Sequence, residues 1–306
     1  MYEQIAKNKA KSVIIIIGFV AFITVIGFVL GYFIDYENSI IFMIFALIIA
    51  AISSFSGYYY SDKMVLGLTG ARPLSREENP RAYYMVEGLS IAAGIPTPKI
   101  YVISDKGMNA FATGRNPQNG VIVLTEGLLE NLNDEELKGV ISHELAHIKN
   151  YDILLGTIVA IFVGMISIIS NIALRSFFFR GGKSKSNEKS GGGILSLIFL
   201  LLGILLIIFS PLIATIIRLA ISRNREFLAD STGVLISRYP AGLASALKKI
   251  SESSKVRTAN NATAHLFIAN PFGSKTKSFF SNLFSTHPPI EERIKRLESM
   301  SLGVGV

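Results

Sequence analysis

Two histidines and a glutamate stand at the spacing of a metal-dependent hydrolase in the stretch His143-Glu144-Leu145-Ala146-His147. In a helix, residues four positions apart share one face, so both imidazoles could hold the same metal ion. The Glu144 carboxylate points into the same sector, where it can take a proton from a water activated by the metal. This combination indicates a zinc peptidase; the competing interpretation is a helix with two surface histidines. Because the chain has only four histidines, an accidental match is rare.

The surrounding sequence predicts the helix that must carry this pattern. Asn133 is a typical N-cap residue, and Glu136, three positions later, completes a capping box. Apolar residues then recur at helical spacing, at Leu137, Val140, Ile141 and Ile148. No proline or cap follows before Ile153, so we expect the helix to continue directly into the next apolar segment.

A catalytic zinc ion needs a third protein ligand and an open fourth position for water. Glu226 and Asp230 lie four residues apart in a segment with helical character, so both can face the same side. Glu226 can bind the metal while Asp230 accepts the N–H of a ligand histidine. Alone, this pair would be an ordinary solvated helix face, and only the histidine pattern favours the metal-binding interpretation.

Four uncharged apolar runs cover residues 13–34, 40–60, 153–174 and 191–217. Each is long enough for a membrane-spanning helix, which needs about 20 apolar residues. The first run exceeds a signal-peptide core and has no cleavage pattern after it, so we expect an uncleaved anchor. The predicted fold is mainly α with a small β-sheet, in a multi-pass membrane protein.

Basic residues set the expected orientation. They precede the first run and follow the second, at Lys7, Lys9, Lys11, Lys63, Arg72, Arg76 and Arg81. The positive-inside rule then places the N-terminus and the catalytic part on the cytoplasmic face of the cell membrane. The loop over residues 175–193 is basic and glycine-rich, so the second pair of runs either spans the bilayer or dips into it. Topology and anionic lipid explain the net charge of +8, and no nucleic-acid partner is expected.

The polar segments have their own predicted elements. We expect a helix that Asn79-Pro80 opens and Gly94 closes, strands over residues 99–104, 109–113 and 121–125, and a turn at Asn119-Gly120. Helices should follow over residues 218–237 and 240–251, then a loop-rich stretch over 253–286. A last amphipathic helix should begin after Pro288-Pro289, with Ile290, Ile294 and Leu297 on one side. The absence of cysteine excludes disulfides and thiolate ligands.

These features divide the chain into four parts. A transmembrane hairpin takes residues 1–62, and the first part of the protease domain takes residues 63–152. A second hydrophobic hairpin takes residues 153–217, and the second part of the protease domain, with the third ligand, takes residues 218–306. Because His147 and Glu226 must meet at one ion, an even number of crossings separates them. The metal should then lie within about 10 Å of the membrane surface.

The chain resembles the HtpX family of membrane zinc metalloproteases, gluzincin-type relatives of the CAAX prenyl proteases. The resemblance covers nearly the whole chain and rests on four motifs: Asn109 to Gly114, His143 to His147, Arg225 to Asp230, and Thr286 to Pro289 with Glu291 to Ile294. It implies a zincin-like domain and an endopeptidase that cleaves misfolded or damaged membrane proteins in quality control. By this resemblance His143, His147 and Glu226 bind one Zn²⁺ per chain, and Glu144 is the general base.

The resemblance also suggests where substrate binds. Asn109, Ala110, Phe111 and Ala112 look like the edge strand against which the substrate backbone lies, as in strand addition. His287 is a candidate for stabilising the tetrahedral oxyanion, although a capping histidine before Pro-Pro is an equal alternative. We assign His265 to packing or to a loop.

Three other functions compete with this one. A prenyl-protein-processing protease would be expected to have more membrane spans. A non-catalytic, zinc-bearing membrane adaptor would not need Glu144. A transporter would need ionisable residues within the apolar runs, which contain none. Membrane-protein substrates and the lipid bilayer are the expected partners, and the oligomeric state is left open.

Overall fold

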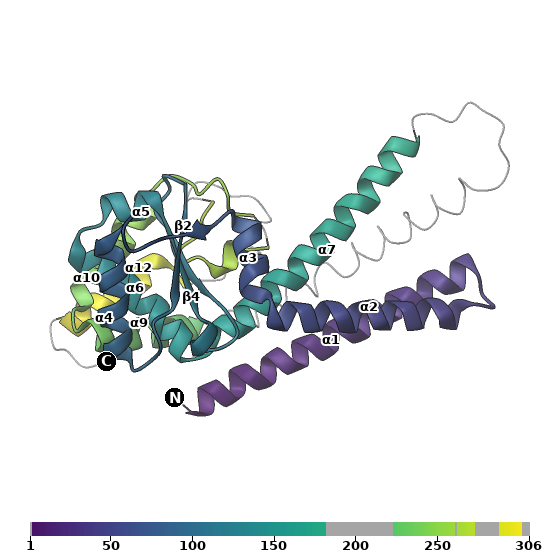
Figure 1. Cartoon of the computed structure of the whole chain (residues 1–306), viewed down its shortest axis with the longest axis horizontal. Helices are drawn as coiled ribbons and strands as arrows, with labels where there is room; N and C mark the ends of the chain where they lie inside the picture. Colours follow the sequence, from purple (N-terminus) through teal and green to yellow (C-terminus); the bar gives the residue numbers. More distant parts are fainter. Residues whose placement is uncertain (1, 182–222, 261, 273–287, 302–306) are drawn as a thin grey trace.

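The computed structural model describes residues 2–181, 223–260, 262–272 and 288–301. Helices surround a small mixed sheet in a polar domain, and long apolar helices extend away from it (Figure 1). The mainly α fold with a small β-sheet is therefore confirmed. The N-terminus lies near the polar domain, at the opposite end of the hairpin from its turn.

The first two apolar runs form a helical hairpin. α1 (Tyr2–Ile34) and α2 (Ser39–Tyr59) are each long and apolar enough to cross a membrane. They pack so closely that a side chain at Gly27 would overlap Ala46. The short α3 (Ser61–Thr69) then leads into the polar domain.

The sheet has the strand order β1-β2-β4-β3. Its strands are β1 (Arg72–Pro73), β2 (Lys99–Ile103), β3 (Ala110–Thr113) and β4 (Val121–Thr125). β2 and β4 are parallel, whereas β1 and β3 pair antiparallel with their neighbours. β4 is buried along its whole length, and β3 forms one edge of the sheet. The three predicted strands are confirmed, and a 3₁₀ turn, η1 (Pro117–Asn119), precedes Gly120.

The helices around the sheet begin and end at the predicted caps. α4 (Pro80–Ala93) has Asn79 at its N-cap, where the side chain accepts from Ala82 N, and it ends at Gly94 with φ 69°. Glycine favours this left-handed conformation, which terminates the helix. α5 (Glu126–Asn131) follows β4 and leads to α6 (Asp134–Lys149). The predicted capping box of α6 is present.

The expected continuous helix after the histidine pattern is wrong. α6 ends at Lys149, and α7 (Asp152–Gly181) begins after a bend of 86°. Tyr151 at this bend has φ 60°, a conformation that non-glycine residues rarely adopt. The side chain of Asn8 on α1 donates hydrogen bonds to the Asn150 carbonyl and to the Asp152 carboxylate, and these bonds hold the bend. They outweigh the local preference for a straight helix.

α7 carries the third apolar run. Up to Ile166 its residues are almost all buried, and they pack against α1 and α3. The helix continues to Gly181, so residues 175–181 are helical although they were assigned to a loop. Arginine and phenylalanine tolerate a helix, so the basic and aromatic residues of this stretch do not prevent α7 from continuing through it. The fourth run, 191–217, lies outside the described residues.

The C-terminal part completes the domain with α9 (Arg223–Ser237), α10 (Pro240–Glu252), η2 (Ala264–Leu266) and α12 (Ile290–Ser301). α9 packs closely against α6, because a Cβ at Gly233 would lie 3.0 Å from His143 N. α12 buries Leu297 against the core, with Ile290 and Ile294 partly buried beside it, as predicted.

Candidate metal centre

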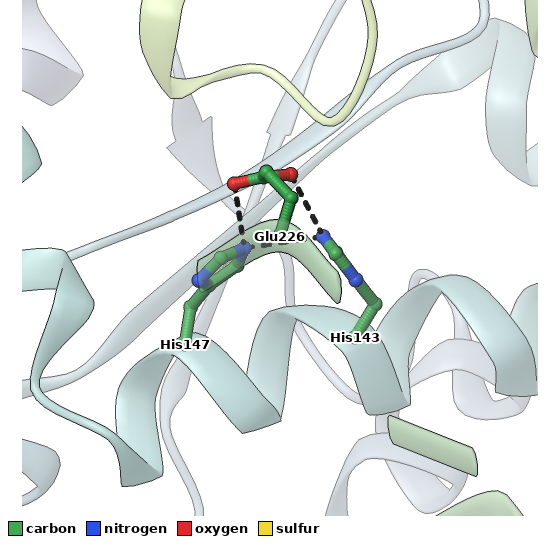
Figure 2. A group of neighbouring side chains, drawn as sticks. All are labelled: His143, His147 and Glu226. Atoms are coloured by element: carbon green, nitrogen blue, oxygen red, sulfur yellow. Dashed lines mark hydrogen bonds and ion pairs between the residues drawn. The ribbon is translucent and has the colours of Figure 1, made fainter. Parts of the chain in front are cut away.

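Two helices bring three candidate ligands together. α6 presents His143 and His147, and α9 presents Glu226 from the other side (Figure 2). The two Nε2 atoms lie 3.1 Å apart, and the Glu226 carboxylate oxygens lie 3.8 Å from His143 Nε2 and 3.6 Å from His147 Nε2. Ligands about 2.0–2.1 Å from a tetrahedral zinc ion are about 3.4 Å apart. The spacing therefore fits one small tetrahedral metal ion.

Each histidine is oriented by a carboxylate on its other ring nitrogen. His143 Nδ1 lies 2.9 Å from Asp230 Oδ1, and His147 Nδ1 lies 3.0 Å from Asp152 Oδ2. Such partners place the proton on Nδ1 and leave the Nε2 lone pair for a metal. Asp230 thus occupies the place expected from the sequence. The role of Asp152 was missed, although an aspartate five residues after His147 was visible.

A buried arginine holds one of these carboxylates. Arg293 on α12 is 1% exposed; its Nε donates to Asp230 Oδ2 at 2.9 Å and its Nη2 to Asp230 Oδ1 at 2.7 Å. Its Nη1 donates to the Ile268 carbonyl at 2.9 Å. The sequence analysis placed Arg293 in a family motif but gave this residue no role. The available signal was a charged residue within the apolar face that carries Ile290 and Leu297.

Glu144 points into the same site. It is 1% exposed and its carboxylate accepts from the Ala112 backbone N–H, whereas its Oε1 has no hydrogen-bond partner among the residues described by the structure. Burial raises the Glu144 pKa to about 7; the Glu226 charge adds to this shift and His147 opposes it. A buried carboxylate oxygen without a donor is costly, and an ion or a water at the adjacent ligands would satisfy it.

The surroundings of the two histidines shift their pKa values in opposite directions. Burial, together with the Arg293 charge, lowers the pKa of His143 to about 4. Burial also acts to lower the pKa of His147, but the hydrogen bond to Asp152 and the Glu226 charge outweigh it and raise the value to about 9. Burial acts to raise the pKa of Asp230, but the Arg293 charge and the hydrogen bonds from His143 and Arg293 together outweigh burial and lower the pKa to about 2. His143 is thus ready to bind a cation, whereas His147 must release a proton first.

A cleft opens over these groups. It is lined by residues from β3, α6, α7, α9, η2 and the segment after η2: Ala112, His143, Glu144, His147, Asp152, Ile153, Gly156, Arg225, Glu226, His265, Leu266 and Ile268. His265, assigned to packing or a loop, lies in η2 with its Nε2 3.0 Å from the Gly156 carbonyl, at the wall of the cleft. His287 lies outside the described residues.

The expected substrate strand borders this cleft only in part. Asn109 precedes β3, and its side chain donates to the Ala269 carbonyl at 3.0 Å. Ala110 O accepts from Ile268 N, and Phe111 is fully buried in the core. Ala112 is the residue of this segment that reaches the cleft.

Several known proteins resemble this chain in sequence, and one solved structure resembles it in fold. The model of "Peptidase family M48" matches residues 76–301. The chain therefore belongs to peptidase family M48. A "Protease HtpX homolog" of Dictyoglomus turgidum is 46% identical over 302 residues, covering 98% of this chain and 94% of the relative. Another, from Thermoanaerobacter pseudethanolicus, is 43% identical over 304 residues, covering 99% and 98%.

The crystal structure of S. mikatae Ste24p aligns with a TM-score of 0.52, covering 97% of this chain and 67% of that chain. At 19% identity this likeness shows a shared fold. The match to the M48 family includes every residue of the candidate metal centre, and the α1–α2 hairpin lies before it. The resemblance to the HtpX family is confirmed, and the protein is a metallopeptidase with membrane-spanning helices.

Proposed function

We propose that this M48 peptidase is a zinc-dependent endopeptidase that cleaves misfolded or damaged membrane proteins at the cytoplasmic face of the cell membrane. The observation that carries the proposal is the convergence of His143, His147 and Glu226 beside the buried carboxylate of Glu144. The ligand atoms of His143, His147 and Glu226 all lie within 4.8 Å of one another.

Zinc suits this site best. Two imidazoles and one carboxylate form the ligand set of catalytic zinc centres, which leave a fourth position open. When bound, zinc would make water acidic enough to attack near neutral pH and would polarise the scissile carbonyl. Asp230 and Asp152 would keep His143 and His147 in the orientation that binds the metal.

Glu144 is the proposed general base. It takes the proton of the attacking water and delivers it to the leaving amine. Its free Oε1 and its pKa near 7 suit a group that must both accept and return a proton near neutral pH. A non-catalytic adaptor would have no use for this carboxylate.

The edge strand β3 would receive the substrate. Ala110 O is already bonded to Ile268 N, so the substrate backbone would meet the strand near Ala112, where β3 borders the cleft. Pairing of extended backbones is insensitive to side chains, which suits an enzyme that accepts many unfolded segments.

The position of the membrane hairpin relative to the metal centre supports the proposed substrate class and orientation. α1 begins beside the metal centre and α2 returns to the polar domain, so both ends of the hairpin lie on the catalytic side (Figure 1). The basic residues Lys7, Lys9, Lys11 and Lys63 flank these ends, as expected for a cytoplasmic face. A site at this position would meet segments that emerge from the bilayer.

The test uses the full-length peptidase in nanodiscs with a fluorescent membrane-protein substrate, either folded or destabilised, and with casein for comparison. We expect cleavage of the destabilised substrate, loss of cleavage with a chelator, and recovery with zinc. Glu144→Gln should retain zinc and lose activity by about 10²–10⁴-fold. Full activity of Glu144→Gln would overturn the mechanism, and cleavage restricted to casein would overturn the substrate class.

A further inference from the structure

The first turns of α1 reach the metal centre. Asn8 is 1% exposed, and its side-chain Nδ2 donates to Asp152 Oδ1 at 2.6 Å and to the Asn150 carbonyl at 3.2 Å. The other oxygen of Asp152 lies 3.0 Å from His147 Nδ1. An amide on the membrane hairpin is thus connected through one carboxylate to a candidate metal ligand.

This amide spans the bend between α6 and α7. Its two acceptors lie on either side of Tyr151, the residue with φ 60°. Lys9 Nζ lies 4.5 Å from the centre of the Tyr151 ring, a cation–π contact that adds to the same clamp. The bend sets the position of Asp152 relative to His147, so contacts that hold the bend also hold this pair.

The buried Asp152 carboxylate requires a hydrogen-bond donor for each of its two oxygens. It is 8% exposed, and one of its oxygens is engaged by His147. A buried carboxylate oxygen that has no hydrogen-bond donor is strongly disfavoured. The Asn8 amide supplies that donor and fixes the direction in which the first oxygen meets the imidazole.

Packing further along the same two helices keeps Asn8 in place. Phe19 of α1 stacks on Phe162 of α7 with ring centroids 3.8 Å apart and an interplanar angle of 7°. Ile15 and Leu155 are buried in the same cluster. Because α7 begins at Asp152, this packing fixes α1 against the element that carries the carboxylate.

We propose that Asn8 is a positioning residue of the metal centre, through which the membrane helix α1 holds Asp152 and thereby His147 in the metal-binding geometry. The inference rests on the proposed function, since it takes His147 as a ligand. It assigns the transmembrane hairpin a role beyond anchoring: the metal centre is completed by a residue at the start of the anchor.

The test compares metal affinity in the full-length protein by competition between the protein and a chelating dye for Zn²⁺ and Co²⁺. Asn8→Ala should bind both ions about tenfold more weakly, the lower end of the effect of residues that orient metal ligands. Asn8→Asp keeps the side-chain size but replaces the donor with an acceptor, and it should weaken binding at least as much. Thermal unfolding with chelator present should show that both variants stay folded.

A matched control lies at the other end of the same hairpin. Asn38 Nδ2 donates to Asp35 Oδ2 at 2.7 Å, again an amide on a carboxylate, but exposed and at the turn between α1 and α2. Asn38→Ala should leave metal affinity and cleavage unchanged. An equal loss in Asn38→Ala and Asn8→Ala would show a general effect of the hairpin and would overturn the assignment.

A double variant tests the route through Asp152. If Asn8 acts only through this carboxylate, Asn8→Ala combined with Asp152→Asn should bind metal no more weakly than Asp152→Asn alone. Wild-type affinity in Asn8→Ala, or additive losses in the double variant, would refute the inference while leaving the proposed function standing. A wild-type protein that binds neither ion would refute both.

Discussion

Arg293 and Asp230 form a buried, two-pronged ion pair between α12 and α9, with N···O distances of 2.9 and 2.7 Å. Through Asp230 the pair reaches His143, so α12 supports a candidate ligand on α6 that lies 150 residues before Arg293. The metal centre therefore depends on helices that contribute no ligand of their own.

Arg293→Ala should damage both folding and metal binding. Removing one partner of a buried ion pair costs about 3–5 kcal/mol in the free energy of unfolding. Misplacing Asp230 should weaken metal affinity by about 10–100-fold. Denaturant unfolding and metal competition measure the two effects.

Arg72→Ala is the matched control for that variant. Arg72 makes the same two-pronged contact with Glu78, at 2.8 and 2.6 Å, but both side chains are more than 40% exposed. Exposed pairs contribute about 0–1 kcal/mol. If the two variants lose equal stability, burial of the Arg293 pair has no special importance.

Metal affinity should rise with pH. In the metal-free protein the pKa of His147 is raised to about 9, so below that pH a proton must leave before the metal binds. The apparent dissociation constant should fall about tenfold for each unit of pH up to about 9, as expected for release of one proton. Competition titrations from pH 6 to 9 would show this slope, and a flat profile would contradict the assignment of His147.

At saturating metal, the rate of hydrolysis should decrease at acidic pH as Glu144 becomes protonated. Burial raises the pKa of this carboxyl to about 7 in the metal-free protein, and a bound cation lowers it by favouring the ionised form. The base must be ionised, so kcat/KM should fall as pH decreases through a midpoint at or below about 7. Activity that increases toward pH 5 would argue against Glu144 as the base.

Gly233→Ala should push the two ligand-bearing helices apart. A Cβ at this position would lie 3.0 to 3.2 Å from backbone atoms of Ser142 and His143, which cannot rotate away. We expect weaker metal binding and a lower unfolding temperature. Gly88→Ala on α4 is the control, because its Cβ would have nothing within 4 Å and alanine favours helix by about 1 kcal/mol.

The sequence alone determined the features that depend on local spacing. Helical periodicity placed His143 and His147 on one face and Glu226 with Asp230 on another, and the caps at Asn79, Gly94 and Asn133 fixed helix ends. The long uncharged runs likewise predicted α1 and α2 as membrane-spanning candidates. These signals are readable because neighbours in the chain produce them.

Only the tertiary structure decided the bend at Tyr151 and the partners of the histidines. Local preference favours a helix running on from α6, yet contacts from Asn8, more than 140 residues away, hold the turn of 86°. Arg293 meets Asp230 across 63 positions for the same kind of reason. Spacing along a chain says which face a residue occupies, but the packing of helices decides which distant residue meets that face.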